Sequence, residues 1–148
     1  MEIILDWNKY LDTAAKMVSE GIVMLKNDNN ALPLDTDKEV AVFGRIQFHY
    51  YKSGTGSGGM VNVTKVVNIL DVLIDNGAKV NEKLLDTYRK WDKENPFDLG
   101  EGWGGEPWSQ KEMPLDEGFV KETAKSCETA IVIIGRTAGE EQDNRDRK

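Results

Sequence analysis

The fold of this chain is decided by the stretch Thr129-Ala-Ile-Val-Ile-Ile-Gly-Arg-Thr-Ala-Gly-Glu-Glu-Gln-Asp-Asn144. Its first half, Ala130 to Gly135, is a continuous apolar and β-branched run that ends in glycine, which is typical of a buried strand in an α/β sheet. The second half is acidic and carries Glu140, Glu141 and Asp143. Ligands of open α/β sheets bind beyond the carboxyl ends of the strands, so a carboxylic acid here is a candidate proton donor. A solvated surface loop is the alternative that this stretch alone leaves open.

The rest of the chain alternates helical and strand patterns. Apolar residues recur at three and four positions over Asn8–Leu25, which predicts an amphipathic helix that Asp6 or Asn8 caps. Further predicted elements are strands at Glu39–Gly44 and Ala78–Val80 and helices at Lys65–Asn76, from Asn81 to before Pro96, and at Asp116–Cys127. The pattern predicts an α/β fold, a three-layer sandwich with a mostly parallel sheet. Only two or three strands can be counted, so the sheet is expected to be incomplete and the chain a piece of a longer protein.

Composition limits the classes of protein and partner. The 148 residues suffice for a single domain, expected to span 1–148. A net charge of -7 argues against nucleic acid and against anionic membranes as partners. No signal peptide or membrane-spanning run is visible, so a cytoplasmic location is expected. One cysteine, Cys127, and one histidine, His49, make no zinc set, and neither a metal nor an organic cofactor is predicted.

A glycine-rich loop follows the predicted strand at Glu39–Gly44. Gly54, Gly56 and Gly59 fit the pattern G-x-G-x-x-G of dinucleotide-binding sites. That motif requires its first glycine directly after a strand, but nine residues separate Gly44 from Gly54. Nucleotide binding is therefore a weak alternative, and the glycines more simply allow the backbone to approach a ligand or another domain closely.

A second irregular stretch, Asn95 to Gln110, mixes the aromatic residues Phe97, Trp103 and Trp108 with glycines. Sugar rings stack their C–H faces on aromatic side chains, so this composition is compatible with a carbohydrate site. The alternative is that these rings attach a long loop to the core. His49 and Lys52 carry little information as single residues.

Several of these stretches together resemble the second, α/β sandwich domain of glycoside hydrolase family 3. The resemblance rests on Glu20-Gly-Ile-Val-Met-Leu-Lys-Asn27, Leu32-Pro-Leu34, Val40-Ala-Val-Phe-Gly44, Gly56-Ser-Gly58 and Ala138-Gly-Glu-Glu-Gln-Asp143. Met24 stands where the family pattern has leucine. The sandwich domain usually follows a (β/α)8 barrel, whereas this sequence resembles the circularly permuted members in which it comes first.

The resemblance implies a function and a set of site residues. It implies that Glu140 is the general acid/base of a retaining β-glycosidase and that Asp143 orients the loop or binds substrate. Gly56, Ser57, Gly58 and Trp103 are expected to contact a β-glucoside or another β-glycoside. The nucleophile is expected in the barrel domain, outside this chain, so these 148 residues alone are expected to be inactive. A non-catalytic carbohydrate-binding domain remains the alternative from another class.

Overall fold

The computed structural model describes residues 4–51, 59, 61–102 and 104–137. The chain divides into two compact units, Met1–Leu34 and Asp35–Lys148, and each is described by itself. Among the described residues, no helix is both long and apolar enough to cross a membrane.

The first unit contains the helix α1 (Trp7–Gly21), all of whose residues are at least partly exposed. The Asp6 carboxylate caps it by accepting a hydrogen bond from the Lys9 amide at 3.1 Å, as one of the two predicted caps. The helix ends before the predicted Leu25. Gly21 is a weak helix former, and the β-branched Ile22 after it has extended backbone angles. Downstream, a short 3-10 helix (Asp28–Asn30) leads to the second unit.

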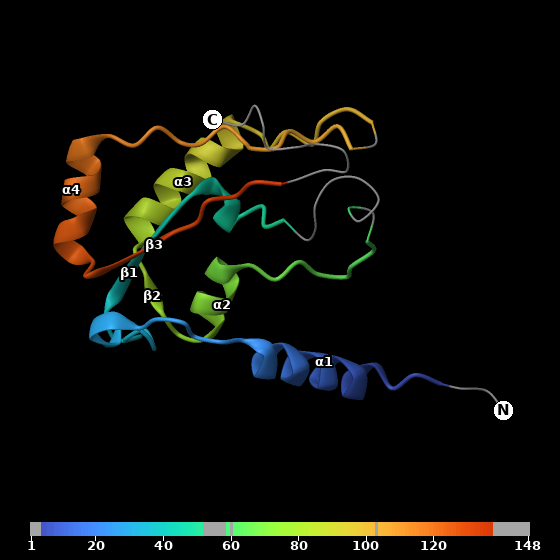
Figure 1. The fold of residues 1–148 in the computed structure, drawn as a ribbon. Helices are drawn as coiled ribbons and strands as arrows, with labels where there is room; N and C mark the ends of the chain where they lie inside the picture. Colours follow the sequence, from blue (N-terminus) through green and yellow to red (C-terminus); the bar gives the residue numbers. More distant parts are fainter. Residues whose placement is uncertain (1–3, 52–58, 60, 103, 138–148) are drawn as a thin grey trace. The chain divides into compact units, whose positions relative to one another are not determined.

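In its described residues the second unit is built on a parallel sheet of three strands, so the predicted α/β fold is confirmed. The strands are β1 (Glu39–Phe43), β2 (Lys79–Val80) and β3 (Thr129–Val132), in the spatial order β2-β1-β3 (Figure 1). The short strand predicted near Val80 is confirmed, and it lies at an edge of the sheet that the described residues form. Regular pairing in β3 ends sooner than its apolar run, although the Ile133 amide still donates to the Phe43 carbonyl at 2.8 Å.

Among the described residues of this unit, three α-helices accompany the sheet, and a side-chain cap begins each of them. They are α2 (Ile69–Asp75), α3 (Glu82–Glu94) and α4 (Glu117–Ser126), capped by Asn68, Asn81 and Asp116. A 3-10 helix, Arg45–Gln47, follows β1 without a side-chain cap. The predicted start of α2 at Lys65 is wrong. The Asn68 side chain accepts from the Asp71 amide at 2.7 Å, and this cap starts the helix at Ile69, four residues later than the apolar spacing indicates.

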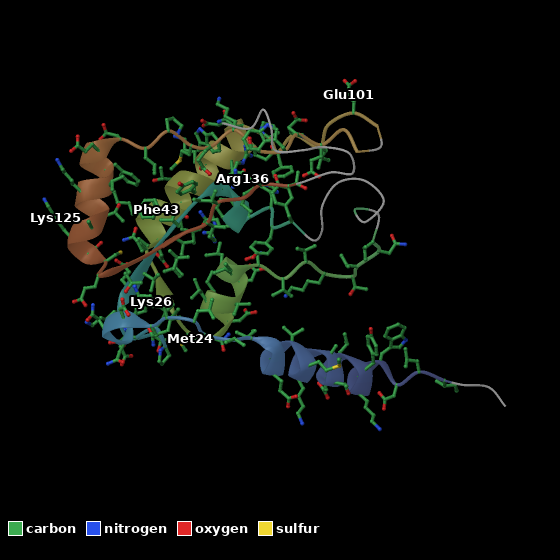
Figure 2. All side chains as sticks on the ribbon, in the orientation of Figure 1. Met24, Lys26, Phe43, Glu101, Lys125 and Arg136 are labelled. Carbon is green, nitrogen blue, oxygen red and sulfur yellow. The ribbon has the colours of Figure 1, made fainter. Side chains whose placement is uncertain are left out.

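The hydrophobic core lies between β1 and the helices α3 and α4. Its buried members are Ala41, Leu84, Tyr88 and Met113, and partly buried rings and side chains surround them: Phe43, Phe48, Trp91, Phe119 and Cys127. Figure 2 shows Phe43 among these elements, whereas Lys125 extends from α4 into solvent. Strand β1 is thus the buried centre of the unit, and its carboxyl end leads directly into the candidate site.

Candidate functional site at the carboxyl edge of the sheet

The carboxyl ends of β1 and β3 bring two loops together. Gly44 follows β1 with a φ of 105°, a region that L side chains rarely adopt. A Cβ atom added there would lie 2.1 Å from the Ile133 carbonyl oxygen, just past β3. Glycine therefore allows the two backbones to approach closely where both strands end.

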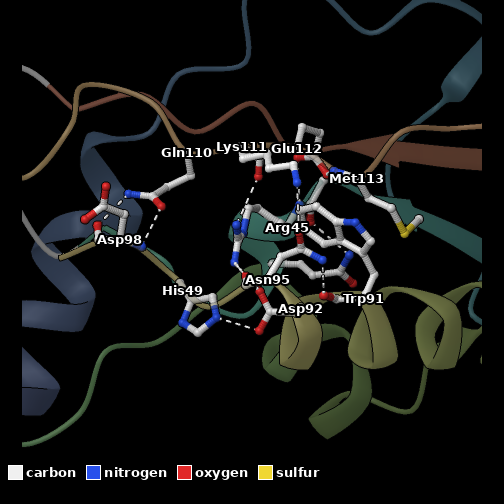
Figure 3. A network of polar contacts seen from close by, with 12 residues as sticks. Arg45, His49, Trp91, Asp92, Asn95, Asp98, Gln110, Lys111, Glu112 and Met113 are labelled. Atoms are coloured by element: carbon white, nitrogen blue, oxygen red, sulfur yellow. Dashed lines mark hydrogen bonds and ion pairs between the residues drawn. The ribbon is translucent and has the colours of Figure 1, made fainter. Parts of the chain in front are cut away.

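Arg45 is the centre of a buried polar network at this edge (Figure 3). Its side chain is 2% exposed, and its Nη2 atom donates to Asp92 Oδ1 at 2.6 Å and to the Asn95 carbonyl at 2.7 Å. Its Nη1 atom donates to the Lys111 carbonyl at 3.0 Å. The guanidinium carbon also lies 4.9 Å from the centre of the Trp91 ring. Arg45 thus joins the end of β1 to the end of α3 and to the segment near Lys111.

The imidazole of His49 shares the Asp92 carboxylate with Arg45. Its Nε2 atom lies 2.8 Å from Asp92 Oδ2, and its ring lies 4.8 Å from the Phe97 ring (Figure 3). In the part of the chain that the structure describes, no group of three or more His, Cys, Asp or Glu side chains could hold a metal ion. The contact of 2.8 Å with Asp92 orients the His49 ring.

The backbone around Gly44 is held by two side chains from other segments. The Gly44 amide donates to the Tyr88 hydroxyl at 3.0 Å, and the Arg45 amide donates to Glu112 Oε2 at 2.9 Å. Burial raises the pKa of Tyr88 above its ordinary value. A cavity of about 340 Å³ adjoins these groups, and its lining includes Trp108 and Ile134. The end of β1 is therefore fixed beside a hollow that could receive part of a ligand.

The base of the tryptophan-containing loop is closed by a reciprocal pair of hydrogen bonds. The Asp98 amide donates to Gln110 Oε1 at 2.9 Å, and Gln110 Nε2 donates back to the Asp98 carbonyl at 2.8 Å. Within this loop, burial and the nearby Asp98 carboxylate raise the pKa of Glu106. These two hydrogen bonds therefore hold the ends of the loop, Asp98 and Gln110, together.

The predicted site residues all lie outside the described residues. These are Glu140, Asp143, Gly56, Ser57, Gly58 and Trp103, and Glu141 and Lys52 are outside them as well. The structure describes the chain up to Thr137, which is 5% exposed and whose amide donates to the Trp108 carbonyl at 2.9 Å. The start of the acidic loop is thus placed beside Trp108, and the predicted roles of the residues beyond it stay predictions.

The sequence did not identify Arg45, Asp92 or Glu112 as site residues. One signal was visible, because Arg45 directly follows the glycine that ends a buried strand. Its partners Asp92 and Lys111 are 47 and 66 residues away in sequence, and no local pattern connects them.

Comparison with known proteins gives consistent matches. The glycosyl hydrolase family 3 C-terminal domain matches residues 22–148. Over 142 residues the chain is 63% identical to a beta-glucosidase of Ruminococcus albus; the match covers 96% of the chain and 15% of that protein. It is 32% identical over 139 residues to beta-glucosidase A of Butyrivibrio fibrisolvens, covering 93% of the chain and 16% of that protein.

Solved structures of two further enzymes match the fold. A beta-glucosidase from Paenibacillus barengoltzii aligns with a TM-score of 0.84 and 50% identity, over 99% of this chain and 16% of that one. Beta-glucosidase 3B from Thermotoga neapolitana, in complex with α-D-glucose, aligns with a TM-score of 0.75 and 29% identity, over 93% of this chain and 19% of that one. The chain therefore spans less than a fifth of the length of these relatives.

Proposed function

Because this chain belongs to glycosyl hydrolase family 3 through that family's C-terminal domain, we propose that it supplies the acid/base half of a retaining β-glycosidase. The proposed substrate is a β-glucoside or a related β-glycoside, since the relatives are named beta-glucosidases. Hydrolysis of the O-glycosidic bond requires two carboxyl groups, and this chain is proposed to contribute one of them.

Glu140 is the proposed general acid/base. In the first step it protonates the glycosidic oxygen as the bond to the sugar breaks, and in the second it removes a proton from the attacking water. The observation that carries this assignment is the hydrogen bond from the Thr137 amide to the Trp108 carbonyl. It supports a location of the acidic loop at the carboxyl edge of the sheet, where α/β folds bind their ligands.

The nucleophile is proposed to lie outside this chain. In a retaining enzyme it attacks the sugar from the face opposite the leaving group, and the two carboxyl groups are about 5–5.5 Å apart. Glu141 and Asp143 belong to the same loop as Glu140 and would approach from the same side. An aspartate of a (β/α)8 barrel domain in a longer polypeptide is the proposed nucleophile, which makes the isolated chain inactive.

The two glycine-containing loops are proposed to enclose the sugar. Gly56, Ser57 and Gly58 would allow close approach of the backbone, and Trp103 would stack on the sugar. The closed base between Asp98 and Gln110 supports this role for the second loop, because a loop with fixed ends loses less conformational freedom when it binds a ligand.

The proposal is tested by Glu140→Gln in the full-length polypeptide that carries this domain, with Glu141→Gln as the matched control. Removal of a general acid should lower kcat/KM for cellobiose by about 10²–10⁴-fold. The adjacent Glu141 variant should stay close to the unchanged enzyme. Equal losses in both variants, or none in either, would contradict the assignment of Glu140.

The isolated 148-residue chain distinguishes the alternatives. We expect no hydrolysis of 4-nitrophenyl β-D-glucoside by this chain, and turnover abolished by Glu140→Gln would show that the nucleophile is inside it. Calorimetric binding of glucose or cellobiose without the barrel would favour a carbohydrate-binding module. A thermal shift with NAD or ATP but not with sugars would favour a nucleotide-binding domain.

A further inference from the structure

We propose that Arg45 is a positioning residue for the acid/base loop. It holds Lys111 and Glu112 by hydrogen bonds, and Trp108 in the same segment accepts the Thr137 amide three residues before Glu140. This inference rests on the proposed function, which makes Glu140 the acid.

The partners of the Arg45 side chain hold it in one well-defined position. This side chain is 2% exposed, and a buried guanidinium without partners would strongly destabilise the folded protein. Asp92 neutralises its charge at 2.6 Å, while Asn95 and Lys111 accept through their carbonyl groups. A planar guanidinium with donors in a fixed fork can satisfy all these partners in only one orientation.

Arg45 forms hydrogen bonds to the two residues before Met113, one from its side chain and one from its backbone amide. The guanidinium donates to the Lys111 carbonyl at 3.0 Å, and the Arg45 amide donates to Glu112 Oε2 at 2.9 Å. The preceding residue, Gln110, is bonded to Asp98 in both directions. Three successive residues, 110–112, are therefore fixed, and they constrain Trp108 two positions before them.

Trp108 is joined to the residue at which the acidic loop begins, Thr137. The Trp108 carbonyl accepts the Thr137 amide at 2.9 Å, and Thr137 is 5% exposed. Glu140 follows three residues later, a distance of at most about 11 Å along an extended chain. A displacement of Trp108 is therefore transmitted to the start of the loop that carries the proposed acid.

This arrangement predicts a kinetic signature that simple loss of folded protein would not produce. A misplaced acid slows only the step in which the leaving group needs a proton. The activated leaving group of 2,4-dinitrophenyl β-D-glucoside departs with little protonation, whereas the sugar leaving group of cellobiose requires it. Misplacement should therefore lower kcat/KM for cellobiose much more than for the dinitrophenyl substrate.

The experiment compares Arg45→Lys and Arg89→Lys in the full-length enzyme. Arg45→Lys keeps the positive charge but removes the planar guanidinium that donates to several partners at once. We expect kcat/KM for cellobiose to fall by up to about 10²-fold, which is the effect of a misplacement of about 1 Å. The dinitrophenyl substrate should be little affected. Arg89 is the matched control, because it is an exposed arginine on α3 that bonds only Asp86 among the described residues.

A second pair of variants tests the last link directly and does not depend on Arg45. Thr137→Ala keeps the main-chain amide, whereas Thr137→Pro removes it and with it the hydrogen bond to Trp108. We expect the proline variant to show the selective loss on cellobiose and the alanine variant to lack it. Identical behaviour of the two variants would overturn the proposal.

The outcomes separate this inference from the proposed function. If Glu140→Gln shows the selective loss and Arg45→Lys lowers both substrates equally, Arg45 is only structural and the inference fails. If Glu140→Gln shows no selective loss, the proposed function itself fails. When both single variants show it, the double variant should show no more than Glu140→Gln alone, because they act through the same proton transfer.

Discussion

The hydroxyl of Tyr88 illustrates how a single buried atom supports the end of β1. It accepts the hydrogen bond of the Gly44 amide at 3.0 Å, and Tyr88 is 1% exposed. Tyr88→Phe would leave that amide without an acceptor, at a cost of about 1–3 kcal/mol in the free energy of unfolding. Urea denaturation measures the change, and Tyr50→Phe at an exposed position is the control. Equal stability of the Tyr88 and Tyr50 variants would contradict this role.

The same residue predicts a pH effect. Burial raises the pKa of Tyr88, so the proton is held more tightly in the folded state than in the unfolded one. The resulting stability is present below the ordinary tyrosine pKa of about 10 and is lost as the pH rises through the folded-state value. Tyr88→Phe should therefore weaken the dependence of stability on pH in the alkaline range.

At the level of elements, Asn81 connects a helix to the sheet. Its side-chain oxygen caps α3 by accepting from the Leu84 amide at 2.8 Å, while its side-chain nitrogen donates to Glu39 Oε2 at 2.9 Å. This hydrogen bond is the main cause of the lowered pKa of Glu39. Glu39 therefore contributes stability above its ordinary pKa, and the contribution is lost as the pH falls through the lowered value.

Substitution of this connecting residue gives a prediction with a defined pH dependence. Asn81→Asp keeps the cap of α3 but replaces the donor to Glu39 by a second carboxylate. We expect a loss of about 1.5–3 kcal/mol at pH 7, the value of a hydrogen bond to a charged group. The loss should shrink toward pH 4.5, as one carboxylate becomes protonated. Chemical denaturation at the two pH values tests this, and a pH-independent loss would contradict it.

The elements also show what the sequence could and could not predict. Strand β1 and the starts of α3 and α4 were predicted closely, because a buried run or a capping residue marks each locally. The strand predicted at Ala78–Val80 begins one residue before β2. The start of α2 was missed, because the apolar residues before Asn68 continue the helical spacing without being helical. The Arg45 network was not predictable, since its partners come together only when α3 and the segment near Lys111 fold against β1.

At the level of the whole molecule, the described sheet has an unpaired edge along β3. In the described part of the chain, β3 pairs with β1 and has no strand on its other edge. Val132 and Ile134 are 65% and 82% exposed. An unpaired apolar edge favours pairing with other chains. The isolated chain should therefore self-associate as its concentration rises.

Light scattering coupled to size-exclusion chromatography tests this expectation. Ile134→Lys should reduce association, because a lysine two residues beyond the end of the edge strand β3 places a charge beside that edge and opposes pairing. The matched control is Val72→Lys, at an exposed position of α2. Each variant changes the net charge from -7 to -6, which by itself favours association, so a decrease confined to Ile134→Lys would identify the edge. Equal behaviour of the two variants would place the contact elsewhere.

The strand order has a consequence for synthesis on the ribosome. β1 is the central strand although it comes first of the three described strands, and its residue Val40 pairs with Thr129, which follows 89 residues later. At about 5–20 residues per second, translation separates the two by about 4–18 s. During that interval the apolar centre of β1 has its short partner β2 at most. The nascent chain therefore presents a hydrophobic segment that chaperones can bind before the sheet closes.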